Sequence, residues 1–119
     1  MAKVMLAEDD PTMVGLLKTL LHMDGYEVVA LDATEDVPAA VRHVRPDVLL
    51  LDVHLSNQNG LEILDNIRSS DGARATRVIM ISGLNLREDC LKRGADDFLL
   101  KPFMPDDLIK TLKRSLKGK

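Results

Sequence analysis

Residues 48–52 form one unbroken apolar run that ends in a carboxylate: Val48-Leu49-Leu50-Leu51-Asp52. A run of this kind, without polar alternation, predicts a strand that is buried on both faces, as in the middle of a parallel sheet. Because an ionised side chain is costly to bury without a partner, the aspartate belongs at the rim of that sheet. This stretch therefore predicts an α/β fold and places a reactive group at its edge.

Four other apolar runs lie on either side of this stretch, and helical spacing follows each of the five. The runs are Lys3–Ala7, Glu27–Leu31, Val78–Ser82 and Asp96–Leu100. The apolar positions at helical spacing are Met13, Leu16, Leu17, Leu20 and Leu21, then Val37, Ala40, Val41 and Val44, then Leu61, Leu64 and Ile67, and finally Leu108, Ile109, Leu112 and Leu116. The fourth helix, roughly residues 85–93, is short. Five strand–helix units predict a doubly wound (βα)5 fold, with a parallel sheet, right-handed crossovers and helices on both faces.

Several helix ends are marked by their residue types. Asp10 is expected to cap the first helix, with Pro11 at its first position and Gly25 after its end. Gly94 is expected to end the fourth helix in a left-handed turn. The last helix begins at Pro105 with acidic residues and ends with basic ones, which suits the helix dipole.

The composition is that of an ordinary globular domain. The chain has 119 residues, of which 45% are hydrophobic and 29% charged, and its formal net charge is −3. This charge gives no electrostatic footprint for nucleic acid. The single cysteine, Cys90, excludes an internal disulfide, and neither a signal peptide nor a membrane-spanning run is present. We expect a single domain over residues 1–119 in the cytoplasm, without direct contact to nucleic acid or membrane.

The ends of the predicted strands carry polar side chains. Glu8 and Asp9 follow the first strand, Asp52 ends the third, Ser82 ends the fourth and Lys101 follows the fifth. Ligands of doubly wound sheets bind at the carboxyl ends of the strands, so these side chains are expected to meet in one cleft. Crowded carboxylates repel one another unless a cation compensates, and Mg²⁺ suits a few carboxylate oxygens completed by water. The rim therefore predicts an Mg²⁺ site beside a nucleophilic carboxylate that is fit for phosphoryl transfer.

These motifs resemble the receiver domain of two-component response regulators, from about residue 3 to residue 116. The matching residues, in order, are the acidic pair Glu8-Asp9, the phosphoacceptor Asp52, the loop glycine Gly60, the hydroxyl residue Ser82 and the sequence Lys101-Pro102-Phe103. The resemblance implies a flavodoxin-like five-stranded parallel sheet with strand order 2-1-3-4-5.

The resemblance also implies a metal centre around the phosphoacceptor. Asp52 would become an aspartyl phosphate. Asp9 would bind Mg²⁺ directly and Glu8 through water, and Mn²⁺ could replace Mg²⁺. The backbone carbonyl of His54, two residues after the acceptor, would be a further metal ligand; its imidazole is disfavoured, since Mg²⁺ prefers oxygen.

Other matching residues have implied roles in binding the phosphoryl group and in switching. Ser82 would bond a phosphoryl oxygen, and Lys101 would pair with the phosphoryl group. The Lys101–Pro102 peptide bond is expected to be cis. Phe98 lies at the position where receivers carry an aromatic ring that changes rotamer on activation, and it is expected to turn inward when Ser82 moves.

The implied function is a phosphorylation-dependent signalling switch that catalyses only its own phosphoryl transfer and dephosphorylation. The donor would be a sensor histidine kinase or a histidine phosphotransfer protein. The signal would leave through the face made by residues 85–93, 96–100 and 105–117, toward a downstream protein or a fused output domain. The chain would be a monomer or a weak dimer through that face. The segment from Ser82 to Lys101 is shorter than is usual in the family by close to one helical turn.

Three other interpretations remain open. A phosphohydrolase of the haloacid dehalogenase type also uses a strand-end aspartate with Mg²⁺, but it needs a second aspartate where this chain has His54. A flavin-binding module would have a Ser/Thr/Gly phosphate loop after the first strand, whereas the acidic loop here would repel phosphate. A receiver-like interaction module that is never phosphorylated would not need the complete set of acidic, hydroxyl and lysine residues.

Overall fold

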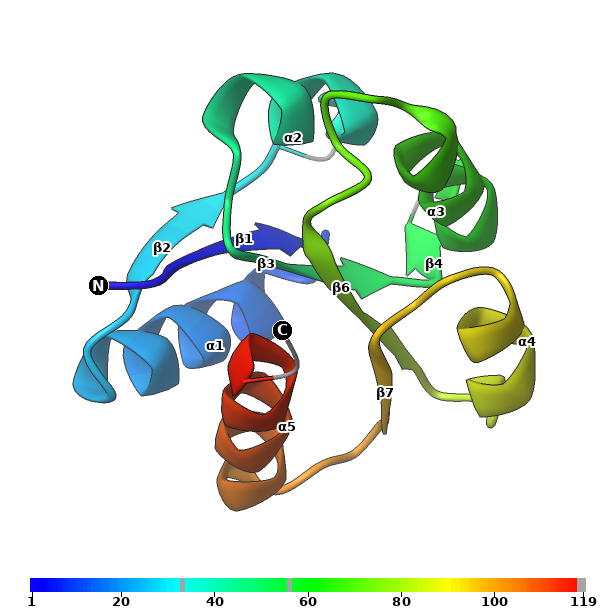
Figure 1. Ribbon diagram of the computed structural model, residues 1–119. Coiled ribbons are helices and arrows are strands. Elements are labelled where there is room, and N and C mark those ends of the chain that lie inside the picture. The colour runs from blue at the N-terminus through cyan, green and yellow to red at the C-terminus, as the bar shows by residue number, and fades with distance from the viewer. Residues whose placement is uncertain (33, 56, 118–119) are drawn as a thin grey trace.

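Five parallel strands form the centre of the molecule in the computed structural model, which describes residues 1–32, 34–55 and 57–117. They are β1 (Lys3–Ala7), β2 (Glu27–Ala30), β3 (Val48–Asp52), β6 (Arg77–Ser82) and β7 (Asp97–Leu100). Their order in the sheet is β2-β1-β3-β6-β7, with every pair parallel (Figure 1). The predicted α/β fold is therefore confirmed, and so is the order 2-1-3-4-5 of the five sheet strands.

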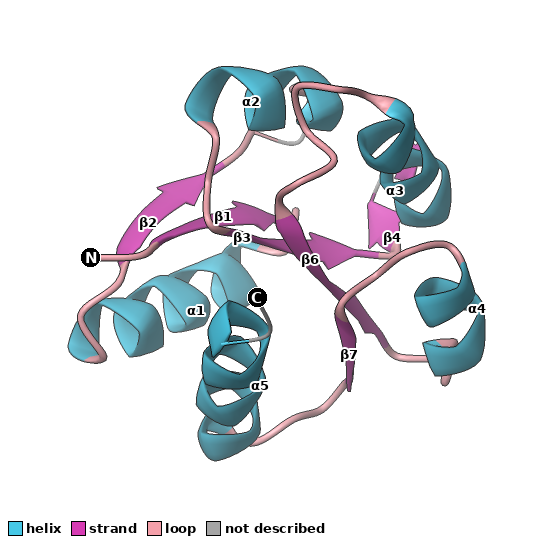
Figure 2. Ribbon diagram, viewed as in Figure 1, coloured by secondary structure: helices cyan, strands magenta, loops and turns pink. Residues whose placement is uncertain are grey.

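Helices cover both faces of this sheet. They are α1 (Pro11–Met23), α2 (Val37–Val44), α3 (Gly60–Ser69), α4 (Arg87–Lys92) and α5 (Pro105–Lys117). Figure 2 shows α1 and α5 on one face, and α2, α3 and α4 on the other. Alternate residues of β3 enter two different cores: Leu50 packs in the core that α1 and α5 complete, and Leu49 and Leu51 in the core of the other face. The apolar run of β3 is unbroken because both of its faces are buried.

The helix ends agree with the signals in the sequence. The side chain of Asp10 accepts a hydrogen bond from the backbone N–H of Thr12 at 3.0 Å, which caps α1. Gly25 and Gly94 have φ angles of 86° and 104°, which a side chain would disfavour. The helix α4 has six residues and no side-chain cap at its start.

The segment after β3 contains two short strands that the sequence pattern does not predict. A two-stranded antiparallel hairpin, β4 (His54–Leu55) and β5 (Gln58–Asn59), lies between Asp52 and α3. Strands of two residues are too short to give a period in the sequence, so pattern analysis could not detect them. The hairpin fixes the path of the backbone immediately after Asp52.

The two ends of the sheet differ in what surrounds them. The strands all point toward the end that carries Asp52, and α5 runs back in the opposite direction (Figure 1). Near its C-terminus, Leu116 joins Pro46 and Asp47 in lining a cavity of about 330 Å³ at the amino ends of the strands. Among the described residues, no helix has the length and apolar character that crossing a membrane would require.

Candidate functional site

Three charged side chains from three strand ends meet at the rim of the sheet. The ammonium nitrogen Nζ of Lys101 lies 2.7 Å from Oδ2 of Asp52 and 3.1 Å from Oε1 of Glu8. The side chains of Asp52 and Glu8 are only 6% and 4% exposed. Although these residues are far apart in the sequence, β1, β3 and the segment after β7 end at the same edge, which brings them together.

Backbone groups hold both carboxylates in place. The N–H of His54 donates to Oδ1 of Asp52 at 2.8 Å, and the N–H of Asp10 donates to Oε2 of Glu8 at 3.2 Å. Each carboxylate therefore has both oxygens bonded, one to the lysine and one to the chain that follows it. Such bonding fixes the orientation of Asp52 before any ligand arrives. The imidazole of His54 itself is exposed.

The electrostatics of the rim follow from this crowding. Burial raises the pKa of Glu8, and the hydrogen bond with Asp52 and the charge of Asp52 raise it further, while Lys101 and the Asp10 N–H oppose them. Burial lowers the pKa of Lys101, but the hydrogen bonds and charges of the two carboxylates outweigh burial, so its pKa is raised overall. The lysine is thus held in its charged form by two acidic groups.

Ser82 reaches the same rim at the end of β6. Ser82 is fully buried, and its Oγ accepts a hydrogen bond from the backbone N–H of Leu84 at 3.0 Å. The carbonyl of Ser82 accepts from the backbone N–H of Lys101 at 2.8 Å, so the two residues are linked through the backbone. The Lys101–Pro102 peptide bond is cis.

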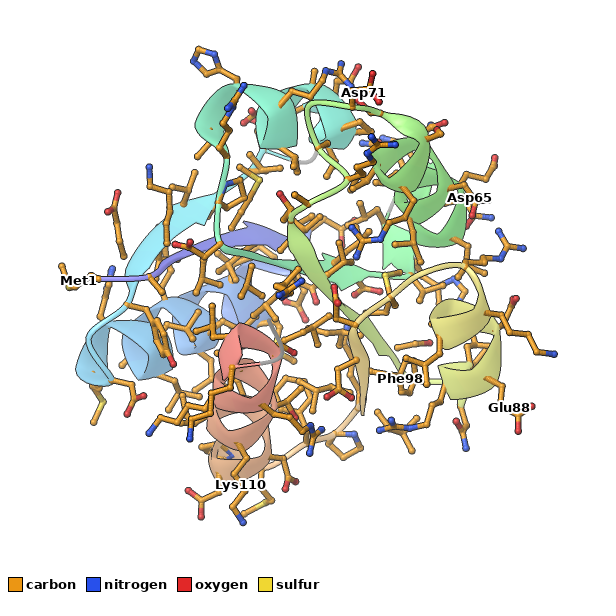
Figure 3. All side chains as sticks on the ribbon, viewed as in Figure 1. Met1, Asp65, Asp71, Glu88, Phe98 and Lys110 are labelled. Atoms are coloured by element: carbon orange, nitrogen blue, oxygen red, sulfur yellow. The ribbon has the colours of Figure 1, made fainter. Side chains whose placement is uncertain are left out.

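Phe98 is already buried in this structure. The residue is 2% exposed and packs in the core shared with Cys90 and Leu86, between β7 and α4 (Figure 3). The guanidinium carbon of Arg87 lies 5.8 Å from the centre of its ring. The ring therefore lies inside the core in this conformation, and its change of rotamer on activation stays a prediction.

Gly60 provides the closest backbone approach next to the site. A Cβ built on this residue would lie 2.6 Å from Cα of Val53 and 2.9 Å from its carbonyl oxygen, and it would also clash with the carbonyl oxygen of Asp52. All three atoms belong to the backbone, so none can rotate away. Only a glycine allows α3 to begin this close to the acceptor strand.

The donor set at the rim has the chemistry for a divalent cation. In the described part of the chain, no three His, Cys, Asp or Glu side chains are assembled as a ready metal cluster. Lys101 instead supplies a cation between Glu8 and Asp52. Half-buried Asp9 follows Glu8 directly at the same rim. Two buried carboxylates that share one cation, followed in the chain by a third acidic residue, supply the oxygen donors that a hard cation such as Mg²⁺ prefers.

Comparison with known families agrees with this geometry. The family model of the response regulator receiver domain matches residues 4–113. The chain belongs to this family. The resemblance drawn from the sequence motifs is thereby confirmed, and the chain is a receiver domain of the kind found in two-component response regulators.

Individual relatives show the same similarity. The receiver domain is 34% identical to the transcriptional regulatory protein TrcR of Mycobacterium tuberculosis, over 97% of this chain and 45% of that protein. It is also 34% identical to the nitrate/nitrite response regulator protein NarL of Escherichia coli, over 98% of this chain and 56% of that protein. The chain thus spans about half the length of these curated relatives.

Solved structures extend the similarity to three dimensions. The receiver domain of the sensor histidine kinase PA1611 from Pseudomonas aeruginosa, described with a magnesium ion in its active site cleft, superposes with a TM-score of 0.87 at 26% identity and 98% coverage of both chains. The chemotaxis protein CheY4 of Vibrio cholerae gives a TM-score of 0.85 at 30% identity, over 97% of this chain and 98% of that chain.

One charged cluster of this receiver domain was not anticipated. The carboxylate of Asp97 at the start of β7 is bound by Arg114 of α5 and Arg87 of α4. Its role is not obvious from the sequence, because an acidic residue at the start of a predicted strand is usually solvated. One feature of the sequence could have indicated this role. An apolar run follows Asp97 directly, so its side chain lies at the edge of a core.

Proposed function

We propose that this receiver domain is a phosphorylation-dependent switch of a two-component system or phosphorelay, and that residues 1–119 form one receiver unit. Asp52 accepts a phosphoryl group from the phosphohistidine of a sensor kinase or of a histidine phosphotransfer protein. The observation that supports this most directly is the buried Asp52 carboxylate at the sheet rim, oriented by a backbone N–H and paired with Lys101 at 2.7 Å.

The transfer is a substitution at phosphorus. A carboxylate oxygen of Asp52 forms the new P–O bond while the P–N bond of the phosphohistidine breaks, and the leaving imidazole takes up a proton. Lys101 keeps its positive charge beside the oxygens that gain negative charge. The Ser82 hydroxyl donates to a phosphoryl oxygen once it turns away from the Leu84 N–H.

A divalent cation fits the same rim. Asp9, Asp52 and the backbone carbonyl of His54 are the residues we assign to Mg²⁺ or Mn²⁺, with Glu8 acting through water. When bound, the cation neutralises the charge of the phosphoryl oxygens. The magnesium described in the PA1611 receiver domain supports this assignment.

Phosphorylation alters the output face through a shift between two packings. The phosphoryl group adds roughly −1.5 to −2 charges, and Ser82 is drawn toward it. The surface formed by α4, β7 and α5 changes with the β6–α4 loop, and a downstream protein or an output domain detects the change. The activity is confined to the domain's own aspartyl phosphate, without a separate substrate or direct contact to nucleic acid.

The test is the intact mass of the protein after incubation with Mg²⁺ and acetyl phosphate. Wild type is expected to gain one phosphoryl group, whereas Asp52→Asn is expected to gain none. If wild type gains no mass, the proposal fails and the never-phosphorylated interaction module takes its place. Turnover of a generic phosphate ester would instead favour the phosphohydrolase.

A further inference from the structure

Asp97 links the two helices that border β7. Its side chain is only 8% exposed, and its Oδ2 accepts hydrogen bonds from Nε and Nη2 of Arg114 at 2.9 and 2.6 Å. Its Oδ1 lies 3.5 Å from Nη1 of Arg87 and accepts from the backbone N–H of Phe98 at 2.8 Å. One buried carboxylate is therefore shared by an arginine from α5 and an arginine from α4.

The two arginines are held unequally. Arg114 forms two short charge-assisted bonds with Asp97, which is the stronger geometry. Arg87 makes a single contact with Asp97, at 3.5 Å, whereas both bonds of Arg114 are shorter, at 2.9 and 2.6 Å. Its other contacts are a bond from Nη2 to the carbonyl of Phe98 at 3.1 Å and the position over the Phe98 ring. Arg87 is therefore the arginine that a small displacement of the backbone removes first.

Such a displacement reaches Arg87 from the phosphorylation site. Arg87 is the first residue of α4 and follows Ser82 by a short loop. That loop is folded onto itself by the bond from the Leu84 N–H to the Ser82 Oγ at 3.0 Å. When the Ser82 hydroxyl turns to a phosphoryl oxygen, this geometry changes and the start of α4 moves with it.

We propose that Arg87 and Asp97 couple the phosphorylation site to α5, an inference that rests on the proposed function. Without phosphate, Asp97 binds both arginines and holds α4, β7 and α5 in one arrangement. Movement of the β6–α4 loop withdraws Arg87, which leaves Arg114 alone on the carboxylate, and α5 shifts relative to β7. Arg87 is a positioning residue, because it acts through Asp97 and touches neither phosphate nor metal.

The C-terminal end of α4 offers a matched control. Arg93, which directly follows the last residue of α4, also forms ion pairs, with Asp65 of α3 at 2.9 Å and with Asp89 of α4 at 3.2 Å. These contacts hold α4 against α3 on the side away from α5. Replacing Arg93 therefore removes the same charge at the opposite end of α4 while leaving the Asp97 cluster intact.

The test combines intact mass with amide NMR, with and without acetyl phosphate and Mg²⁺. In wild type and in Arg93→Met, phosphorylation is expected to shift amide signals in the β6–α4 loop and in residues 110–117. In Arg87→Met, and in the nearly isosteric Asp97→Asn, we expect the same gain of mass and the same loop shifts, but loss of the shifts in residues 110–117.

Two results would overturn the coupling. One is that shifts in α5 persist in phosphorylated Arg87→Met and Asp97→Asn. The other is that α5 does not respond in phosphorylated wild type. Both require a protein that has gained the phosphoryl group, so they are distinct from failure of the proposed function, in which wild type gains no mass. If Arg87 and Asp97 had only a structural role, their replacement would change the spectra of the unphosphorylated and phosphorylated proteins alike. The shifts that phosphorylation causes in residues 110–117 would then remain.

Discussion

Replacing Lys101 with methionine removes the ammonium that bridges Glu8 and Asp52 while keeping a long side chain. The two carboxylates stay buried, at 4% and 6% exposure. Removing one partner of a buried ion pair typically costs about 3–5 kcal/mol. Because the Lys101 side chain is itself 27% exposed, water already reaches this group. We therefore expect Lys101→Met to lose about 2–3 kcal/mol of unfolding free energy in a metal-free buffer.

Added Mg²⁺ should reverse much of this loss. A cation that binds only the folded state at a hundred times its dissociation constant stabilises it by about 2.7 kcal/mol. Lys101→Met should gain more than wild type, since no ammonium competes for the same oxygens. The assay is urea unfolding followed by circular dichroism, in EDTA and in Mg²⁺, with Lys110→Met on the exposed face of α5 as the control.

Equal stability of Lys101→Met and wild type in EDTA would show that the lysine does not neutralise the carboxylates. An equal effect of Mg²⁺ on wild type and variant would show that metal and lysine do not compete. Either result would refute the reasoning about charge at the rim.

Three further predictions concern the packing of the helices on the sheet. Gly60→Ala forces a Cβ to within 2.9 Å of backbone atoms of Val53 and should lower the unfolding free energy by about 2 kcal/mol or more; an unchanged urea midpoint would contradict this. Arg68 donates to the carbonyl of Thr76 at 2.8 Å and to three other acceptors, so Arg68→Met should lose about 2–4 kcal/mol in the same assay. Burial raises the pKa of the Cys90 thiol, and a neighbouring carboxylate raises it further. Iodoacetamide should therefore label Cys90 slowly in the folded protein and faster in urea. Equal labelling rates would show that the thiol is not protected by the fold.

Most of the fold could be predicted because its signals are local and strong. The bounds of β1 and β3 agree with the apolar runs, since a strand buried on both faces has no polar residue to interrupt it. The start of α1 at Pro11 follows from the Asp10 cap. The polar residues at the strand ends are brought to one rim by the parallel topology alone, so Asp52, Glu8 and Lys101 meet as expected.

What could not be predicted depends on geometry across elements. The sequence motif implies that Lys101 faces the phosphoryl group, but no motif reveals that the ammonium binds Glu8 as well as Asp52. The burial of Phe98 in this conformation depends on the position of α4, which no local pattern fixes. The role of Asp97 needs the two arginines that reach it from separate helices.

The direction of α5 determines where a mechanical signal leaves this domain. The helix begins beyond the carboxyl end of β7 and ends beside Pro46 and Asp47, at the amino ends of the strands. At 13 residues it is a rod about 20 Å long. The C-terminal end of α5 therefore lies at the opposite end of the sheet from Asp52. In the proposed coupling, a tilt of α5 would transmit the change at Asp52 to this distant end of the domain.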